Sequence, residues 1–193
     1  MPHLETASLG VWINSGARSE APQEHGLAHF LEHMAFKGTR TRSALEIAEQ
    51  IEAVGGALNA MTSFETTDYF ARVLKEHVPL ALEILADILQ NPVFSPEDMD
   101  REKDVILQEI ASLQDSPDDL VFESVQQAAF PDQPLGRSIL GTPESVRDLT
   151  REHLSLYRET AYTTPCMVIG AAGAVDHDAI VRLSEDQFTH FST

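Results

Sequence analysis

Apolar and polar positions alternate, or recur at helical spacing, along nearly the whole chain. Residues 9–13 alternate as a half-buried strand does. Between residues 25 and 36 the apolar side chains recur three or four positions apart, which predicts an amphipathic helix. The same patterns predict further strands at residues 57–62, 68–74 and 167–172, and further helices at residues 43–54, 78–90, 96–113, 117–129 and 150–162, with others opening at Thr142 and Asp176.

Polar residues mark the starts of several of these helices. Ser43 and Glu46 have the spacing of a capping box, in which each side chain accepts from the backbone N–H of the other. Ser116 precedes a first-turn proline and is expected to cap its helix in the same way. Strands and helices are mixed without strict alternation, and no repeat or linker divides the chain. We therefore expect a single α+β domain over residues 1–193.

The charge balance narrows the range of partners. The 193 residues include 13 Lys and Arg against 31 Asp and Glu, which gives a net charge of −18. This balance argues against a nucleic-acid partner, which needs a basic surface, and against anionic membrane surfaces. It is compatible with basic peptides, because an acidic cleft attracts cations. Simple solubility is the alternative explanation for most of these carboxylates.

The single cysteine, Cys166, bears on the compartment. It cannot form an internal disulfide, so we expect a reducing compartment, and a bacterial cytoplasm or a mitochondrial matrix would both fit. No apolar run approaches the ~18 residues of a membrane helix. The first strand pattern lies almost at Met1, from which we expect an upstream portion of the protein to be missing.

The first predicted helix carries the motif His29-x-x-Glu32-His33. Helical spacing places His29 and His33 on one face, about one turn apart, so that two imidazoles can reach one metal ion. Glu32 lies beside them and could take a proton from a metal-activated water. Random placement would produce this motif in about 3 of 100 such chains, so the competing interpretation is an exposed face with incidental histidines.

A catalytic zinc site needs a third protein ligand from elsewhere in the chain. Glu102 and Glu109 lie seven residues apart on one predicted helix, hence on the same face. Glu109 stands in an apolar stretch, where a lone carboxylate is costly unless paired or metal-bound, and is the stronger candidate. His25 lies one turn before His29 and could form an alternative three-histidine face, although Gly26 favours a helix-start or supporting role.

The residues of the motif also carry a family resemblance. The segment His29-Phe-Leu-Glu32-His33-Met-Ala-Phe-Lys-Gly-Thr39 resembles the inverted zinc motif of the pitrilysin/insulysin/processing-peptidase family of metallopeptidases. The resemblance covers nearly the whole chain and is greatest to the processing-peptidase β subunit and its bacterial relatives. It extends to Gly55-Gly56-Ala-Leu-Asn59-Ala60, to the helix around Glu102 and Glu109, and to Leu135-Gly136-Arg137…Gly141-Thr142-Pro143.

The resemblance implies a fold and a set of roles. The fold would be a mixed, largely antiparallel sheet packed with helices. The enzyme would be a zinc metalloendopeptidase that hydrolyses extended, basic peptides or presequences by metal-activated water. In that family's pattern, Zn²⁺ would be bound by His29, His33 and Glu109, Glu32 would be the general base, Glu102 would support the site, and Asn59 and Ala60 would contact substrate backbone by strand addition.

Members of the family usually contain two tandem domains of this kind, and this chain corresponds to the first. We therefore expect the N-terminal catalytic half of a larger peptidase, lacking its first strand and completed by a C-terminal half or a partner subunit. The isolated chain would then hydrolyse peptides poorly. Without the first strand, residues 8–14 would form an unpaired sheet edge, so we expect a tendency to form homodimers.

Two other interpretations remain open at this stage. The chain could be a non-catalytic peptide-binding or assembly subunit with the same fold, or a metal-free α+β domain with incidental histidines. The ionisable cluster of the motif argues against the first, because a purely structural subunit does not need it.

Overall fold

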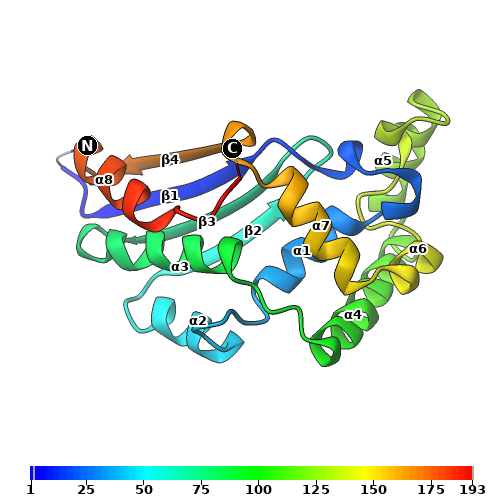
Figure 1. Cartoon of the computed structure of the whole chain (residues 1–193). Helices are drawn as coiled ribbons and strands as arrows, with labels where there is room; N and C mark the ends of the chain where they lie inside the picture. Colours follow the sequence, from blue (N-terminus) through cyan, green and yellow to red (C-terminus); the bar gives the residue numbers. More distant parts are fainter. Residues whose placement is uncertain (2, 193) are drawn as a thin grey trace.

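The computed structural model describes residue 1 and residues 3–192, and it combines one β-sheet with α-helices (Figure 1). All strand pairings are antiparallel and the strand order is β2-β3-β1-β4, so the predicted α+β class is confirmed. The strands are β1 (Thr6–Ile13), β2 (Ala57–Thr62), β3 (Thr67–Leu74) and β4 (Met167–Gly173). The helices are α1 (Leu27–Ala35), α2 (Ala44–Glu52), α3 (Val78–Gln90), α4 (Pro96–Gln114), α5 (Pro117–Ala129), α6 (Pro143–Asp148), α7 (Arg151–Ala161) and α8 (His177–Gln187).

Most predicted helix starts are observed as the sequence suggests. Ser43 accepts from the Glu46 N–H while the Glu46 carboxylate accepts from the Ser43 N–H, which completes the capping box of α2. Ser116 is an exception, because its hydroxyl donates to the Asp119 carboxylate and caps no backbone group. The first-turn acid thus competes with the backbone for the serine.

The sheet packs one face against the helices. Alternate residues of β1 and β3 point into the core, and α3 contacts both strands (Figure 1). Trp12 and Phe70 lie on the opposite face and are partly exposed. This alternation follows from the two-residue period of a strand. The buried apolar side chains of these strands are Ala7, Leu9, Val11, Ile13, Tyr69, Ala71 and Val73.

The prediction of an unpaired edge at residues 8–14 is wrong. β1 pairs with β3 on one side and with β4 on the other, so it is a central strand. Within the described part of the chain the sheet edges are β2 and β4. The error arose because a strand's own pattern shows which residues are buried and not how many neighbours it has, and β4 returns to β1 from far along the chain.

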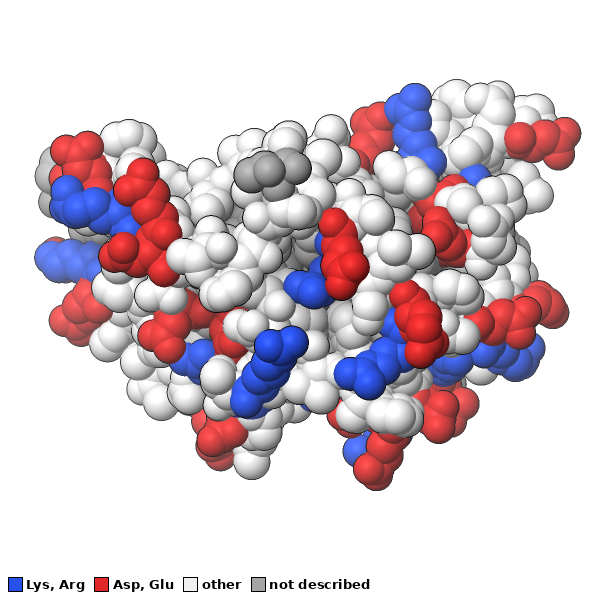
Figure 2. Space-filling view, in the orientation of Figure 1, with Lys and Arg blue, Asp and Glu red and all other residues white. Residues whose placement is uncertain are grey.

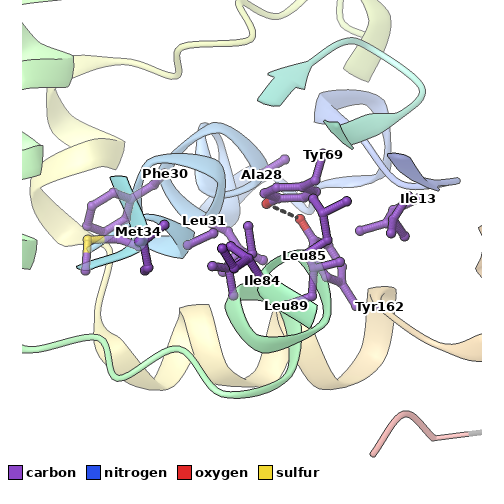
Figure 3. Packing of buried hydrophobic residues seen from close by; sticks show 14 of the residues in the cluster. Ile13, Ala28, Phe30, Leu31, Met34, Tyr69, Ile84, Leu85, Leu89 and Tyr162 are labelled. Carbon is purple, nitrogen blue, oxygen red and sulfur yellow. Dashed lines mark hydrogen bonds between the residues drawn. The ribbon is translucent and has the colours of Figure 1, made fainter. Parts of the chain in front are cut away.

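Helix α1 lies at the end of the sheet and contacts β2, α4 and α7. Its apolar side chains Phe30, Leu31 and Met34 are fully buried. Figure 3 shows Leu31 beside Ile84 of α3, and the hydrogen-bonded pair Tyr69 and Tyr162 near Leu85 of the same helix. This packing fixes the rotation of α1, because its apolar stripe must face the core. The remaining side of α1 therefore faces α4 and β2.

Candidate metal centre

Three side chains from two helices converge beside α1. His29 and His33 come from α1 and Glu109 from α4, and one donor atom of each lies within 4.8 Å of the others. The two imidazole Nε2 atoms are 3.2 Å apart. Glu109 Oε2 lies 3.6 Å from His29 Nε2 and 3.8 Å from His33 Nε2. The structure thus brings together the three residues that the sequence singled out as candidate ligands.

The spacing of these donors fits a small tetrahedral ion. Four donors at about 2.1 Å from one zinc ion lie roughly 3.4 Å from one another. The three separations between the donors of His29, His33 and Glu109 fall on both sides of that value. Two neutral imidazoles and one carboxylate also form a donor set that suits zinc. The residues present therefore fit the metal that the motif suggests.

A second carboxylate orients His33. His33 Nδ1–H donates to Glu102 Oε2 at 3.0 Å, and Lys37 Nζ pairs with Glu102 Oε1 at 2.6 Å. A carboxylate that is paired with a lysine accepts hydrogen bonds, so the imidazole proton lies on Nδ1. The lone pair on Nε2 is then directed toward His29 and Glu109. Hydrogen bonds of this kind fix the tautomer of metal-binding histidines in proteins.

His29 is held in its neutral form. Burial, and to a smaller extent the neighbouring His33, lower its pKa from 6.5 to about 4. A neutral imidazole has a free lone pair, which metal binding requires. Its Nδ1 is buried without a hydrogen-bond partner among the described residues. His29 is therefore uncharged at neutral pH.

Glu32 projects from α1 toward the edge strand β2. Its Oε2 accepts a hydrogen bond from the Thr62 hydroxyl, at the end of that strand. Burial raises the pKa of Glu32, while the bonds from Thr62 act in the opposite direction. The pattern of the sequence gave no signal for Thr62, because the contact joins segments 30 residues apart.

The burial of Glu102 and Glu109 on α4 is the opposite of what their sequence neighbours suggested. Glu102 is buried, with 7% of its surface exposed, although charged residues surround it in sequence. The Glu109 side chain is 40% exposed, although its sequence neighbours are apolar. The reason is helical geometry, since the buried face of α4 is formed by Met99, Glu102, Ile106 and Ile110. Sequence neighbours on a helix point in different directions, so burial follows the face and not the local composition.

His25 does not join the three donors. Its Nε2–H donates to the Ser138 carbonyl oxygen at 2.7 Å, and the residue lies just before α1. The alternative three-histidine face is therefore not the arrangement that the structure shows. The helix-start position that the sequence favoured for His25 agrees with this geometry.

Asn59 and Ala60 lie on β2, which is an edge strand within the described residues. Asn59 Oδ1 accepts from the Ala60 N–H at 2.9 Å. Thr62 on the same strand bonds to Glu32, so the edge of the sheet runs directly to the candidate site. An unpaired edge presents backbone groups to which an extended chain can add.

The chain resembles known proteins along most of its length. Residues 2–143 match the family described as Insulinase (Peptidase family M16). An uncharacterized zinc protease of Rickettsia bellii is 46% identical over 189 residues, which are 98% of this chain and 46% of that protein. A probable mitochondrial-processing peptidase subunit beta of Arabidopsis thaliana is 47% identical over 189 residues, 98% of this chain and 36% of that protein.

One solved structure extends the comparison to the fold. The crystal structure of a protease from Helicobacter pylori superposes with a TM-score of 0.92 at 22% sequence identity, over 98% of this chain and 46% of that one. The family resemblance deduced from the sequence is thereby confirmed in family and in fold. The chain spans about half the length, or less, of these relatives.

Proposed function

Because this chain belongs to the insulinase family of peptidases, family M16, we propose that it is the metal-binding half of a zinc metalloendopeptidase. Its zinc ligands would be His29, His33 and Glu109. The observation that carries the proposal is the convergence of their donor atoms within 4.8 Å, with His33 oriented by Glu102. Bound there, zinc would act as a Lewis acid that makes water a nucleophile at neutral pH.

The residues around the three donors have separate tasks in this proposal. Glu32, placed at the end of β2 by its bond from Thr62, would accept a proton from the attacking water and later return it to the leaving amine. Its raised pKa suits this task, because a general base works best when its pKa approaches the ambient pH. Glu102 and Lys37 hold the His33 imidazole in one tautomer and orientation.

The substrate in this proposal is an extended peptide that adds to the edge of β2. Asn59 and Ala60 would contact its backbone beside the site. Basic peptides are favoured by the net charge of −18, which attracts cations over a distance. Figure 2 shows acidic and basic side chains intermingled on the visible face, so the attraction belongs to the whole molecule more than to one patch of that face.

Further parts complete the proposed enzyme. A relative that is 47% identical is named as a subunit, which supports a partner polypeptide or a second half. No helix within the described residues is long and apolar enough to cross a membrane. The compartment remains a prediction, with a bacterial cytoplasm favoured and a mitochondrial matrix as the alternative.

The variant Glu32→Gln separates a peptidase from a binding subunit of the same fold. We expect slow, zinc-dependent cleavage of a quenched fluorescent basic peptide by the chain, and a loss of about 10²–10⁴-fold in the variant. Zinc content should not change, because Glu32 is not among the three donors. Equal cleavage by both chains would contradict the role of Glu32. Peptide binding without cleavage by either chain would favour the binding subunit.

A further inference from the structure

A buried carboxylate lies under the first turn of the helix that carries the motif. Glu20 is only 3% exposed. Its Oε1 accepts from the Ala28 N–H at 2.7 Å and its Oε2 from the Gly26 N–H at 2.9 Å. The first N–H groups of a helix have no partner inside the helix, and buried ones must find one elsewhere. Gly26, at the N-cap position of α1, has no side chain that could accept these hydrogen bonds. The carboxylate of Glu20, six residues upstream, accepts them instead.

A loop that is distant in sequence, residues 135–143, also contacts the start of α1. Arg137 donates from Nη2 to the Glu20 carbonyl oxygen at 3.2 Å. His25 donates to the Ser138 carbonyl, and the backbones of Gly26 and Gly141 touch so closely that a Cβ on Gly26 would lie 2.8 Å from the Leu140 carbonyl oxygen. Arg137, Ser138, Leu140 and Gly141 all belong to the segment Leu135–Pro143. The family resemblance included this segment, but the proposed chemistry does not use it. The segment therefore packs against the start of α1.

The carboxyl group of Glu20 is unusual among the helix caps of this chain because it is buried and its pKa is raised. Burial raises its pKa to about 7, while the two N–H donors and Arg137 act in the opposite direction and Glu24 adds to the rise. Burial also raises the pKa of the Tyr157 hydroxyl on α7, and Glu20 and Glu24 add to that rise. Other helix starts in the described chain, such as those of α2 and α7, use the short side chains of Ser43 and Thr150. Burying a carboxylate costs free energy that a serine or threonine cap does not. The use of Glu20 at this position therefore suggests a role beyond capping.

We infer that Glu20 and Arg137 are positioning residues that fix the first turn of α1 and thereby the separation between His29 and the donor Glu109 on α4. The inference rests on the proposed zinc site. His29 directly follows Ala28, whose N–H is held by Glu20, whereas Glu109 is held by another helix. Metal sites tolerate ligand displacements of only about 0.5 Å, so a shift of this turn alters the site before it unfolds the helix.

The test compares Glu20→Gln with two matched controls. The glutamine keeps the size and one acceptor, but its amide NH₂ faces an N–H donor of α1. Glu24→Gln removes the same charge four residues away, where the carboxylate accepts from the Ala21 N–H and from no group of α1 within the described residues. Ser43→Ala removes a cap from α2 and serves as the control for general loss of stability. Zinc affinity is measured by competition with a chromophoric chelator, and ligand geometry by visible absorption after Co²⁺ substitution.

We expect Glu20→Gln to bind one zinc per chain about tenfold more weakly and to change the shape of the Co²⁺ absorption band. Both controls should keep the affinity and the band of the parent chain. If Glu20→Gln behaves as Glu24→Gln does in both measurements, Glu20 is only a structural cap and the inference is wrong. If neither the parent chain nor the two control variants bind zinc, the proposed function itself is wrong, and the inference about Glu20 is wrong with it.

A second variant covers the case in which Glu20→Gln does not fold. Arg137→Met leaves both caps of α1 intact and removes only the guanidinium that holds the Glu20 backbone. We expect it to weaken zinc binding by a smaller factor, with the same change in the Co²⁺ band. An unchanged affinity and band in this variant would overturn the inference.

Discussion

At the scale of single residues, the sequence revealed the donors but not their supports. Two histidines at helical spacing with an intervening acid form a local pattern, so His29, Glu32 and His33 could be singled out without a structure. Lys37 and Thr62 could not, because each acts through a contact with another element. The environments of Glu102 and Glu109 were misjudged for a related reason, since the fold decides which face of α4 is buried.

The orienting role of Glu102 predicts a loss of zinc affinity without a loss of zinc stoichiometry. Glu102→Gln replaces an acceptor of the His33 Nδ1–H with an amide that can turn either way, and it leaves Lys37 without its partner. We expect zinc to bind about 10–100-fold more weakly. Glu97→Gln, on the exposed side of the same helix, is the matched control and should bind as the parent chain does. Equal affinities for the two variants would contradict the orienting role.

The buried carboxylate of Glu20 predicts a pH dependence of stability with a definite sign. Its pKa rises from 4.5 to about 7 on folding, so the folded chain holds this proton more tightly than the unfolded chain. Its contribution to the free energy of unfolding is therefore greatest below pH 4.5 and is lost as the pH rises through 7. We expect the metal-free parent chain to lose about 3 kcal/mol relative to Glu20→Gln between pH 4 and pH 8.

Urea unfolding at several pH values measures that difference. The Glu24→Gln chain should keep most of the parent's pH dependence, because the Glu20 carboxylate stays buried and loses only the smallest contribution to its raised pKa, that of Glu24. A difference between the parent chain and Glu20→Gln that does not change with pH, or that changes in the opposite direction, would contradict the raised pKa of Glu20.

At the scale of elements, periodicity predicted nearly every helix and strand but not the neighbours of each strand. The sequence placed a helix at residues 78–90, and α3 spans Val78–Gln90. It could not place β1 in the centre of the sheet, because β4 pairs with it from about 160 residues away. The predicted strand at residues 167–172 is observed as β4 and is rich in apolar residues, yet Val168 is 66% exposed at a sheet edge. Pairing depends on long-range contacts, which local patterns do not encode.

The start of α1 offers a test at this scale. Gly26 has a φ of +91°, and a Cβ there would lie 2.8 Å from a carbonyl oxygen. Gly55 has a φ of +66° after α2, with no atom within 4 Å of such a Cβ among the described residues. Both Gly→Ala variants lose about 1–2 kcal/mol to the left-handed backbone. Gly26→Ala should lower the free energy of unfolding more than Gly55→Ala does, because it also pushes α1 away from residues 135–143. Equal unfolding free energies of the two variants in urea would contradict this packing.

At the scale of the whole molecule, the free edge of β4 and the net charge act against each other. A free edge with an exposed apolar side chain such as Val168 can pair with a second copy. The charge of −18 repels that copy at low ionic strength. We therefore expect homodimers that increase with salt and are reduced by Val168→Lys. Val121→Lys on α5 is the control, and light scattering that finds only monomers at high salt and protein concentration would contradict this expectation.

The central claim is that this half of the molecule assembles a zinc site by itself, and zinc content with affinity tests it most directly. The measurement compares the parent chain with Glu109→Gln and with Glu97→Gln on the same helix. The account predicts one zinc per chain, bound much more weakly by Glu109→Gln and unchanged by Glu97→Gln. No zinc in the parent chain, or equal binding by all three chains, would contradict it.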